Sequence, residues 1–265
     1  MKNSKGYSDK IKKLYKSLKK KYPKVEPVTH DTVTESLVYG AISEYLTDKG
    51  AKDAFANILG YFTNFNELRV SRTEEILEII NYKDDKLARE VVYSIVRVLA
   101  SIFASFNNID LESLKKLGKR PAKQALEELE GITTFMIDYC MFTALSGHAI
   151  PLNTAMIDYL VGEELVYPSS EQKDIEGFLT RLISANQGYE FYSLLRQESE
   201  TYKPKKKKTV TKKTTKKKAA KKATKKKPVT KKTTKKVTKK KIAKKAVKKT
   251  KTKAVRKKTK KKTKK

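Results

Sequence analysis

The sequence has very few of the residues from which metal and redox sites are built. Among its 265 residues it contains one cysteine, Cys140, two histidines, His30 and His148, and no tryptophan. A single cysteine excludes a disulfide framework and any site with several cysteine ligands, including an iron–sulfur cluster. Two histidines disfavour a metal site made only of histidine ligands. We therefore expect a protein with no metal and no other cofactor.

Long hydrophobic runs are also missing. No stretch approaches the roughly 18 apolar residues that a membrane-spanning helix requires. The N-terminal sequence MKNSKGYSDKIKKLYK lacks the apolar centre of a secretory signal peptide. We expect an intracellular protein with no membrane partner.

Acidic residues are absent from the last quarter of the chain. Residues 203–265 contain 35 lysines, Arg256 and no acid, whereas residues 26–202 contain 16 bases and 28 acids. The formal net charge of +33 therefore comes from the ends of the chain, and the central part is acidic. We predict three regions, which are a basic N-terminal helix or arm at 1–25, a globular body at 26–202 and a disordered basic tail at 203–265.

The tail repeats lysine doublets and triplets separated by Thr, Ala and Val. Lysine is a point charge that neutralises phosphate but cannot read a base. The expected partner is double-stranded DNA, bound without sequence preference and with strong dependence on salt. A solubilising tail and an anionic membrane are the less favoured readings. The tail resembles the C-terminal tails of linker histones, and we assign phosphate contacts to the lysines of its first clusters, Lys205, Lys206, Lys207, Lys208, Lys216, Lys217 and Lys218.

The body reads as all-α. Apolar residues recur at helical spacing, and no convincing two-residue alternation of a strand is present. Residues 8–21 predict a short basic helix with one apolar stripe. The helix either docks on the body through this stripe or binds phosphate through its lysines. The other predicted helices are 31–47, 51–63, 72–81, 84–106, 110–116, 121–130, 134–146, 153–161, 170–183 and 187–199.

The most informative stretch is a helical hairpin at 121–160. One predicted helix runs into Glu130-Gly131-Ile132-Thr133, and the next begins near Thr134. A tight turn with a glycine before a helix N-terminus points backbone N–H groups outward, where they can bind phosphate. We therefore predict DNA contacts at Gly131, Ile132, Thr133 and Thr134.

The wider segment resembles the helix-hairpin-helix module of the endonuclease III superfamily of base-excision DNA glycosylases. Leu129-Glu130-Gly131-Ile132-Thr133 stands where that family has Leu-Pro-Gly-Val-Gly, and Ile150-Pro151-Leu152-Asn153-Thr154 stands at its second motif. The resemblance covers roughly residues 33–200. It implies two helical lobes around a DNA-binding cleft and a relation to base-excision repair.

The sequence differs from the family at the positions of its two catalytic residues. The family's catalytic aspartate corresponds here to Asn153, and its Schiff-base lysine corresponds to Phe135. Asparagine is neither a general base nor a charge that stabilises a cationic transition state, and phenylalanine cannot form an imine. No catalytic residue is therefore confirmed, and whether the protein is an enzyme is left open.

Two carboxylates are the nearest substitutes for a catalytic group. Asp138 lies one turn after Phe135, and Asp158 lies five residues after Asn153. We expect both to be solvent-facing helix residues. We expect His148 to be structural and Cys140 to be a small core residue.

Three functions fit the sequence. The first is a DNA-binding protein with a glycosylase-like fold and without the standard glycosylase or lyase chemistry. The second is an active glycosylase with an altered catalytic residue. The third is a histone-like protein that compacts DNA through its tail. The sequence does not give the DNA structure preferred or the oligomeric state.

Overall fold

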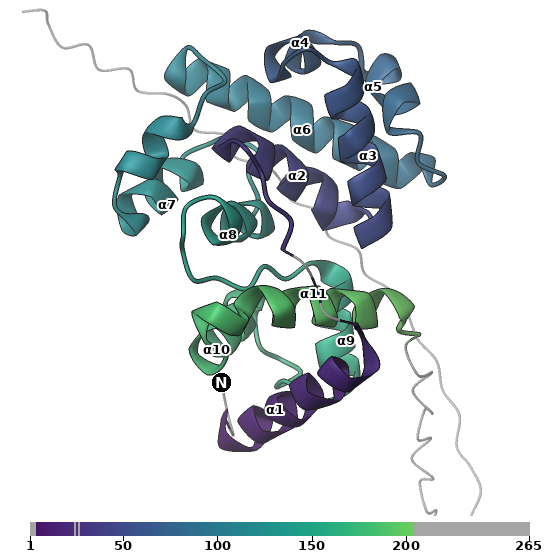
Figure 1. The fold of residues 1–265 in the computed structure, drawn as a ribbon, viewed down its shortest axis with the longest axis vertical. Coiled ribbons are helices and arrows are strands. Elements are labelled where there is room, and N and C mark those ends of the chain that lie inside the picture. The colour runs from purple at the N-terminus through teal and green to yellow at the C-terminus, as the bar shows by residue number, and fades with distance from the viewer. Residues whose placement is uncertain (1–3, 24, 26, 204–265) are drawn as a thin grey trace, which may run out of the picture. The chain divides into compact units, whose positions relative to one another are not determined.

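The computed structural model describes residues 4–23, 25 and 27–203, and these residues contain helices and no strand (Figure 1). The predicted all-α fold is confirmed. The predicted tail lies outside the described residues. The elements are α1 Ser4–Lys21, α2 Val33–Tyr45, α3 Asp48–Tyr61, α4 Phe65–Val70, α5 Thr73–Ile80, α6 Asp85–Phe106, the 3-10 helix η1 Glu112–Lys116, α7 Lys119–Glu127, α8 Thr134–Thr143, α9 Thr154–Gly162, α10 Gln172–Leu182 and α11 Ala185–Thr201.

The helices of the body form two lobes. In the first lobe α2 lies at the centre and packs against α3, α6 and α8. Most residues of α2 from Val33 to Ser43 are buried, which is the pattern of a helix enclosed on all sides. In the second lobe α11 packs against both α9 and α1 (Figure 1).

Side-chain caps define where several helices begin. The Thr32 hydroxyl accepts a hydrogen bond from the Glu35 N–H at the start of α2. Asn64 and Asp84 cap α4 and α6 in the same way. Each cap satisfies backbone donors that the helix itself leaves unpaired. At its other end, α6 stops where Asn107 adopts a left-handed conformation with φ of 53°.

Two segments differ from the sequence prediction. The segment predicted as a helix at 110–116 forms the 3-10 helix η1, with the Leu114 N–H bonded to the Leu111 carbonyl. The six-residue α4 was not predicted. It is shorter than two turns, so it has too few apolar positions to show a helical period.

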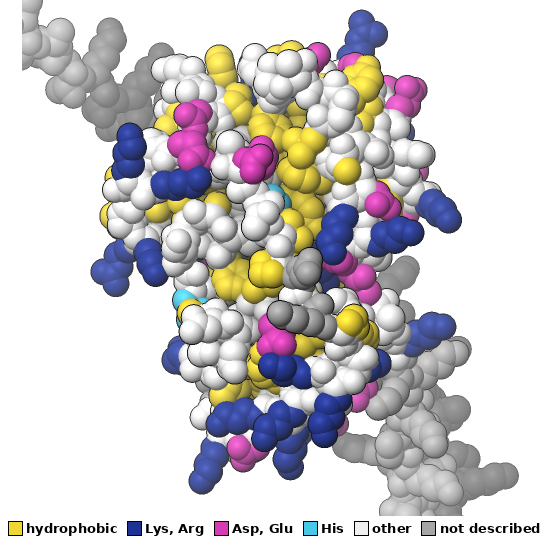
Figure 2. Space-filling model, in the orientation of Figure 1, with side chains coloured by type: hydrophobic (Ala, Val, Ile, Leu, Met, Phe, Trp, Pro, Cys, Tyr) yellow, Lys and Arg dark blue, Asp and Glu magenta, His cyan; other side chains and the backbone are white. Residues whose placement is uncertain are grey.

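The basic helix α1 docks on the second lobe through its predicted apolar stripe. Ile11, Tyr15 and Leu18 are buried, and the Tyr15 ring meets the edge of Phe191 at 5.5 Å between ring centroids. The Tyr15 hydroxyl also donates to the Glu190 carboxylate. Three lysines of α1 join this contact, because Lys19 pairs with Glu190 at 2.9 Å, Lys21 pairs with Glu198 at 2.5 Å and Lys10 donates to the Glu164 carbonyl at 2.8 Å. Figure 2 shows Lys and Arg side chains gathered over this end of the drawn face. Whether they bind phosphate stays a prediction.

No described helix has both the length and the apolar character required to cross a membrane.

Candidate nucleic-acid interface

The predicted hairpin is present between α7 and α8. Gly131 has φ of 83°, in the left-handed region that favours glycine. Thr133 is the N-cap of α8, and its hydroxyl accepts from the Met136 N–H at 3.1 Å. The same hydroxyl donates to the Glu44 carboxylate at 2.8 Å. Because this hydroxyl has a single proton and donates it to Glu44, the Thr133 side chain has no donor left for a phosphate at the turn.

Burial raises the pKa of the Glu44 carboxyl, and the hydrogen bond from Thr133 opposes that rise. Glu44 lies on α2, so this bond fastens the start of α8 to the central helix of the first lobe. The turn is therefore held in position by the core and not only by its own two helices.

The other side of the turn is held by α6. The Arg97 guanidinium pairs with the Glu130 carboxylate at 2.9 Å, and the Glu130 N–H donates to the Ser101 hydroxyl at 2.7 Å. A Cβ placed on Gly131 would lie 2.6 Å from Cδ of Arg97. The glycine therefore permits both the positive φ and the close approach of Arg97. The arginine also compensates the negative charge that Glu130 brings to the turn.

Phe135 lies in the core. Its side chain is 1 % exposed and stacks on Tyr139 with 6.2 Å between ring centroids. Tyr139 in turn stacks on Tyr39 and meets His30 and Tyr192 edge-on. The position that would carry a lysine nucleophile is thus one end of a packed aromatic cluster.

The aromatic cluster contains unpaired polar atoms. His30 Nε2 lies 3.0 Å from the Tyr139 hydroxyl, and burial lowers the pKa of His30 to about 4. His30 Nδ1 and the Tyr39 hydroxyl are buried without a protein hydrogen-bond partner. Burial raises the pKa of Tyr39 as well, so both groups are held neutral near pH 7.

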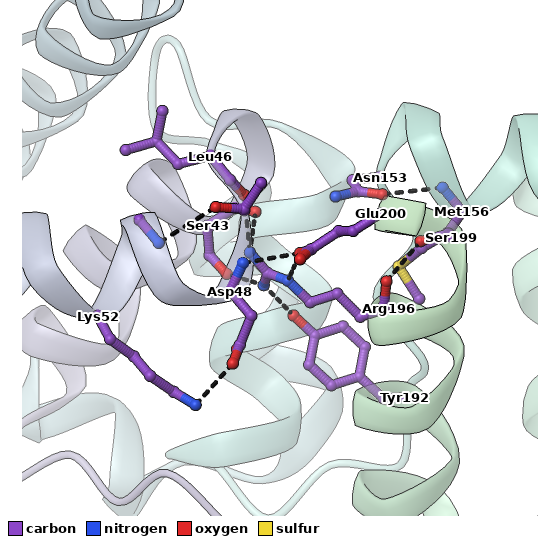
Figure 3. A network of polar contacts seen from close by, with 12 residues as sticks. Ser43, Leu46, Asp48, Lys52, Asn153, Met156, Tyr192, Arg196, Ser199 and Glu200 are labelled. Carbon is purple, nitrogen blue, oxygen red and sulfur yellow. Dashed lines mark hydrogen bonds and ion pairs between the residues drawn. The ribbon is translucent and has the colours of Figure 1, made fainter. Parts of the chain in front are cut away.

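Asn153 is the N-cap of α9. Its side chain is 8 % exposed, and its Oδ1 accepts from the Met156 N–H at 3.0 Å (Figure 3). An asparagine in this geometry satisfies a helix donor, which is a structural role.

A buried arginine joins the two lobes (Figure 3). Arg196 of α11 is 2 % exposed and donates to the Ser43 hydroxyl, to the Ser43 carbonyl at 3.0 Å and to the Leu46 carbonyl at 2.8 Å. It also donates to Tyr192 at 2.8 Å and pairs with Glu200 at 3.1 Å. Sequence reasoning missed Arg196, although Tyr192 and Glu200 stand four residues before and after it on the same helix face.

A cavity of about 740 Å³ opens next to the hairpin. Ile132 and Thr134 of the hairpin line it, and α10 supplies the opposite wall. The other lining residues are Lys123, Glu127, Ile137, Asp138, His148, Ala149, Lys173, Glu176, Gly177, Thr180 and Arg181.

The prediction for Asp138 is wrong. The residue is 4 % exposed, and its carboxylate pairs with Lys123 of α7 at 3.0 Å, because α7 packs against α8. Burial raises the pKa of Asp138, and Lys123 opposes that rise. Glu176, on α10, is 6 % exposed, and burial raises its pKa to about 7. Sequence reasoning did not single out Glu176.

The remaining predicted residues have simpler surroundings. Asp158 is exposed, as predicted. His148 Nε2 lies 2.8 Å from the carbonyls of both Thr180 and Ile183, which agrees with a structural role. Cys140 is fully buried, and burial raises the pKa of its thiol to about 12.

The tail lysines and the metal ligands are the last of the sequence predictions to compare with the structure. The tail lysines Lys205, Lys206, Lys207, Lys208, Lys216, Lys217 and Lys218 lie outside the described residues. Within residues 4–23, 25 and 27–203, no group of three or more His, Cys, Asp and Glu side chains is arranged to hold a metal ion.

No family model matches the sequence, and no curated protein sequence matches it either. Solved structures do match the fold. A trapped endonuclease III–DNA covalent intermediate aligns with a TM-score of 0.55 at 14 % identity, over 71 % of this chain and 84 % of that one. The 8-oxoguanine glycosylase/lyase of Clostridium acetobutylicum, in complex with double-stranded DNA, aligns with a TM-score of 0.54 at 16 % identity, over 73 % of this chain and 70 % of that one.

A third match is the H. pylori 3-methyladenine DNA glycosylase bound to 1,N6-ethenoadenine. It aligns with a TM-score of 0.52 at 12 % identity, over 76 % of this chain and 99 % of that one. The body therefore has the two-lobed helical fold of the helix-hairpin-helix DNA glycosylases, and the predicted fold is confirmed. At these identities the likeness establishes the fold alone.

Proposed function

We propose that this protein binds double-stranded DNA through the hairpin turn and does not cleave the bond between base and sugar. The lysine-rich tail at 203–265 would tether it to the same DNA. The fold supports DNA binding, because chains with this fold have been solved with DNA. The proposal also assigns the chain to base-excision repair by descent.

One observation carries the non-catalytic part of the proposal. Phe135 and Asn153, which the family resemblance places at the catalytic lysine and aspartate, both have structural roles. Phe135 is 1 % exposed inside the aromatic cluster, and Asn153 caps α9. A group that cannot reach a substrate contributes neither a nucleophile nor a charge to its transition state.

The binding step would use the start of α8. Backbone N–H groups at a helix N-terminus attract phosphate without a basic side chain, and Gly131 lets the turn approach the DNA backbone closely. Arg97 lies beside the turn, and its charge is offset by its ion pair with Glu130, so the main-chain N–H groups would carry the contact. These contacts would position the body on DNA without reading its sequence.

The tail would supply most of the affinity. Residues 26–202 have more acids than bases, and an acidic body is repelled by DNA at long range. A tethered basic tail raises the local concentration of DNA near the hairpin, so a weak hairpin contact becomes useful.

The binding test compares the full chain with a chain that ends at Lys203. Both are titrated against a matched duplex and a duplex with one abasic site in a gel-shift assay. The apolar core lies within the described residues, so we expect the shortened chain to fold and to bind both duplexes weakly. If the shortened chain binds no duplex, the hairpin contact is wrong and DNA compaction by the tail becomes the better account.

A pair of charge variants locates the contact. Thr134→Glu adds a carboxylate at the first residue of α8, and Ala185→Glu adds one at the first residue of α11. An acid in the first turn suits a helix, so both variants should fold. Only Thr134→Glu should weaken binding by the shortened chain, and equal effects of the two variants would argue against the hairpin.

The catalytic test uses a panel of duplexes with damaged bases, followed by alkaline cleavage of abasic sites. We expect no strand scission by the full chain or by Asn153→Asp. A new aspartate at position 153 would still cap α9, and Phe135 would still occupy the lysine position. Strand scission by the unmodified chain would establish the alternative, a glycosylase with an altered catalytic residue.

A further inference from the structure

Exposed lysines line the side of α1 that faces away from its buried stripe. With 3.6 residues per turn, they fall within about 100° of arc around the helix. Asp9 is the only acid of α1, so this face is strongly positive. No ion pair among the described residues involves any of these lysines. They are Lys5, Lys12, Lys13, Lys16 and Lys20, and we call them the α1 lysine face.

The docking of α1 fixes the direction of this face. Lys10, Lys19 and Lys21 are bonded to the second lobe, and the buried stripe packs on α11. These contacts use the lysines at the edges of the stripe and hold the helix in one orientation. The α1 lysine face is therefore displayed by the folded body, independently of the tail.

Arg181 of α10 connects the α1 lysine face with the hairpin. It lines the cavity of about 740 Å³ together with Thr134, and it also lines a hollow of about 330 Å³ together with Ser4 and Ser8 of α1. Lys173 is a second exposed base on α10. Positive side chains therefore extend from the hairpin over α10 to α1, although residues 26–202 have a net negative charge.

The chemistry of this face favours a nucleic acid over a membrane. A helix that lies on a bilayer inserts apolar side chains next to its lysines. The apolar side chains of α1, including Ile11 and Leu18, are already buried in the body. From Lys5 to Lys20 the face extends over about 22 Å at 1.5 Å per residue. Duplex DNA carries about one charge per 1.7 Å of its length, so several phosphates lie within reach of such a row.

We propose that the α1 lysine face binds phosphates of double-stranded DNA and is a second contact region of the body, on the same duplex that the hairpin holds. This inference rests on the proposed function, because the duplex is the one assigned to the hairpin. The lysines act as point charges and read no sequence. The hairpin positions the body, and α1 lengthens its footprint on the DNA.

Lysine acetylation of the full chain, read by mass spectrometry, tests the contact residue by residue. The protein is acetylated alone and with a duplex roughly 100 Å long, which is about 30 base pairs. Lys12, Lys16 and Lys20 should react about threefold more slowly in the complex, since a lysine held on a phosphate is shielded from the reagent. Lys10 and Lys21 are the matched controls on the same helix and should change little, because they contact the second lobe.

A pair of double variants measures the ionic contribution of the face. Lys12→Gln with Lys16→Gln removes two of its charges, and glutamine has nearly the helix propensity of lysine. If both lysines meet phosphates, the slope of log affinity against log salt concentration becomes shallower by about 2. Lys52→Gln with Lys116→Gln removes the same charge from exposed lysines of α3 and η1 and should leave the slope unchanged. Circular dichroism shows whether each variant is folded, and equal slopes for the two variants overturn the inference.

Two further measurements separate this inference from its alternatives. If the duplex binds while the α1 lysine face reacts as it does in the free protein, the inference is overturned and DNA binding stands. Protection that persists in Thr134→Glu supports the face even where the hairpin contact fails. Vesicles of phosphatidylglycerol and phosphatidylcholine are the membrane probe. Protection by these vesicles without protection by the duplex overturns the assignment to DNA.

Discussion

Gly131 and Arg97 occupy one small volume at the hairpin. The glycine has φ of 83°, and the arginine side chain lies where any Cβ at position 131 would stand. The residue is therefore fixed by two independent requirements, backbone conformation and space.

Gly131→Ala should destabilise the protein by about 1–3 kcal/mol, because alanine is strained at positive φ and must also displace Arg97. The matched control is Gly60→Ala in α3, where an added Cβ meets no atom within 4 Å. That substitution should stabilise the helix by up to about 1 kcal/mol. Urea unfolding monitored by tyrosine fluorescence measures both, and equal effects would contradict the assignment.

Glu176 should make stability depend on pH. Its pKa in the folded protein is about 7, above the ordinary 4.5, so the folded state holds a proton that the unfolded chain has already lost. The free energy of unfolding contributed by this group therefore falls as pH rises from about 4.5 to 7 and stays lower above that window.

Glu176→Gln stays neutral at every pH and should be more stable than the natural chain at pH 8. The gain should be about 1–2 kcal/mol, reduced from the full linkage value because the cavity is open to water. Below about pH 4 the two proteins should be equally stable. Unfolding curves at several pH values check this, and a gain that persists at low pH would point to packing instead.

The sequence predicted some of these residue roles and missed others for a physical reason. The turn at Gly131 and the core position of Cys140 follow from local pattern. The burial of Asp138 and the raised pKa of Glu176 do not, because the two residues line one cavity from α8 and α10, which are far apart in the chain.

At the scale of elements, the helical spacing of apolar residues predicted most of the helices, and capping residues indicated where they begin. Predicted 84–106 and observed Asp85–Phe106 agree closely because a long apolar stripe and the Asp84 cap both mark that helix. The pairing of α11 with α2 was not predictable, since a lone arginine on a helix ordinarily faces water.

Arg196 is the clearest test of that pairing. Arg196→Met should cost about 3–4 kcal/mol, because the carbonyls of Ser43 and Leu46 lose buried donors. The control is Arg89→Met, since the pair between Arg89 and Asp85 is exposed and should contribute less than about 0.5 kcal/mol. Chemical denaturation compares them, and a small loss for Arg196→Met would mean that the lobes are held mainly by apolar packing.

At the scale of the whole molecule, charge and fold are divided between different parts of the chain. The body supplies the fold, and residues 203–265 supply 35 lysines. We therefore expect changes in the tail to alter the affinity for DNA, and changes in the body to alter how the protein is positioned on DNA.

Salt separates the two contributions. If about ten tail lysines engage DNA, the slope of log affinity against log salt concentration should be near −9 for the full chain. The chain ending at Lys203 should show a slope of about −2, because only a few phosphate contacts remain. Binding isotherms from low to high salt give both values. Equal slopes would show that the body, and not the tail, makes most of the ionic contacts.

Because Cys140 is buried, the labelling of its thiol can be used to detect local opening of the protein. The side chain is fully enclosed within α8 and its pKa is about 12, so a thiol reagent in solution meets no thiolate while the protein is closed. Labelling can then proceed only through openings that release the second hairpin helix from α2. Because no other cysteine competes, the labelling rate reports how often the hairpin comes apart in the native protein.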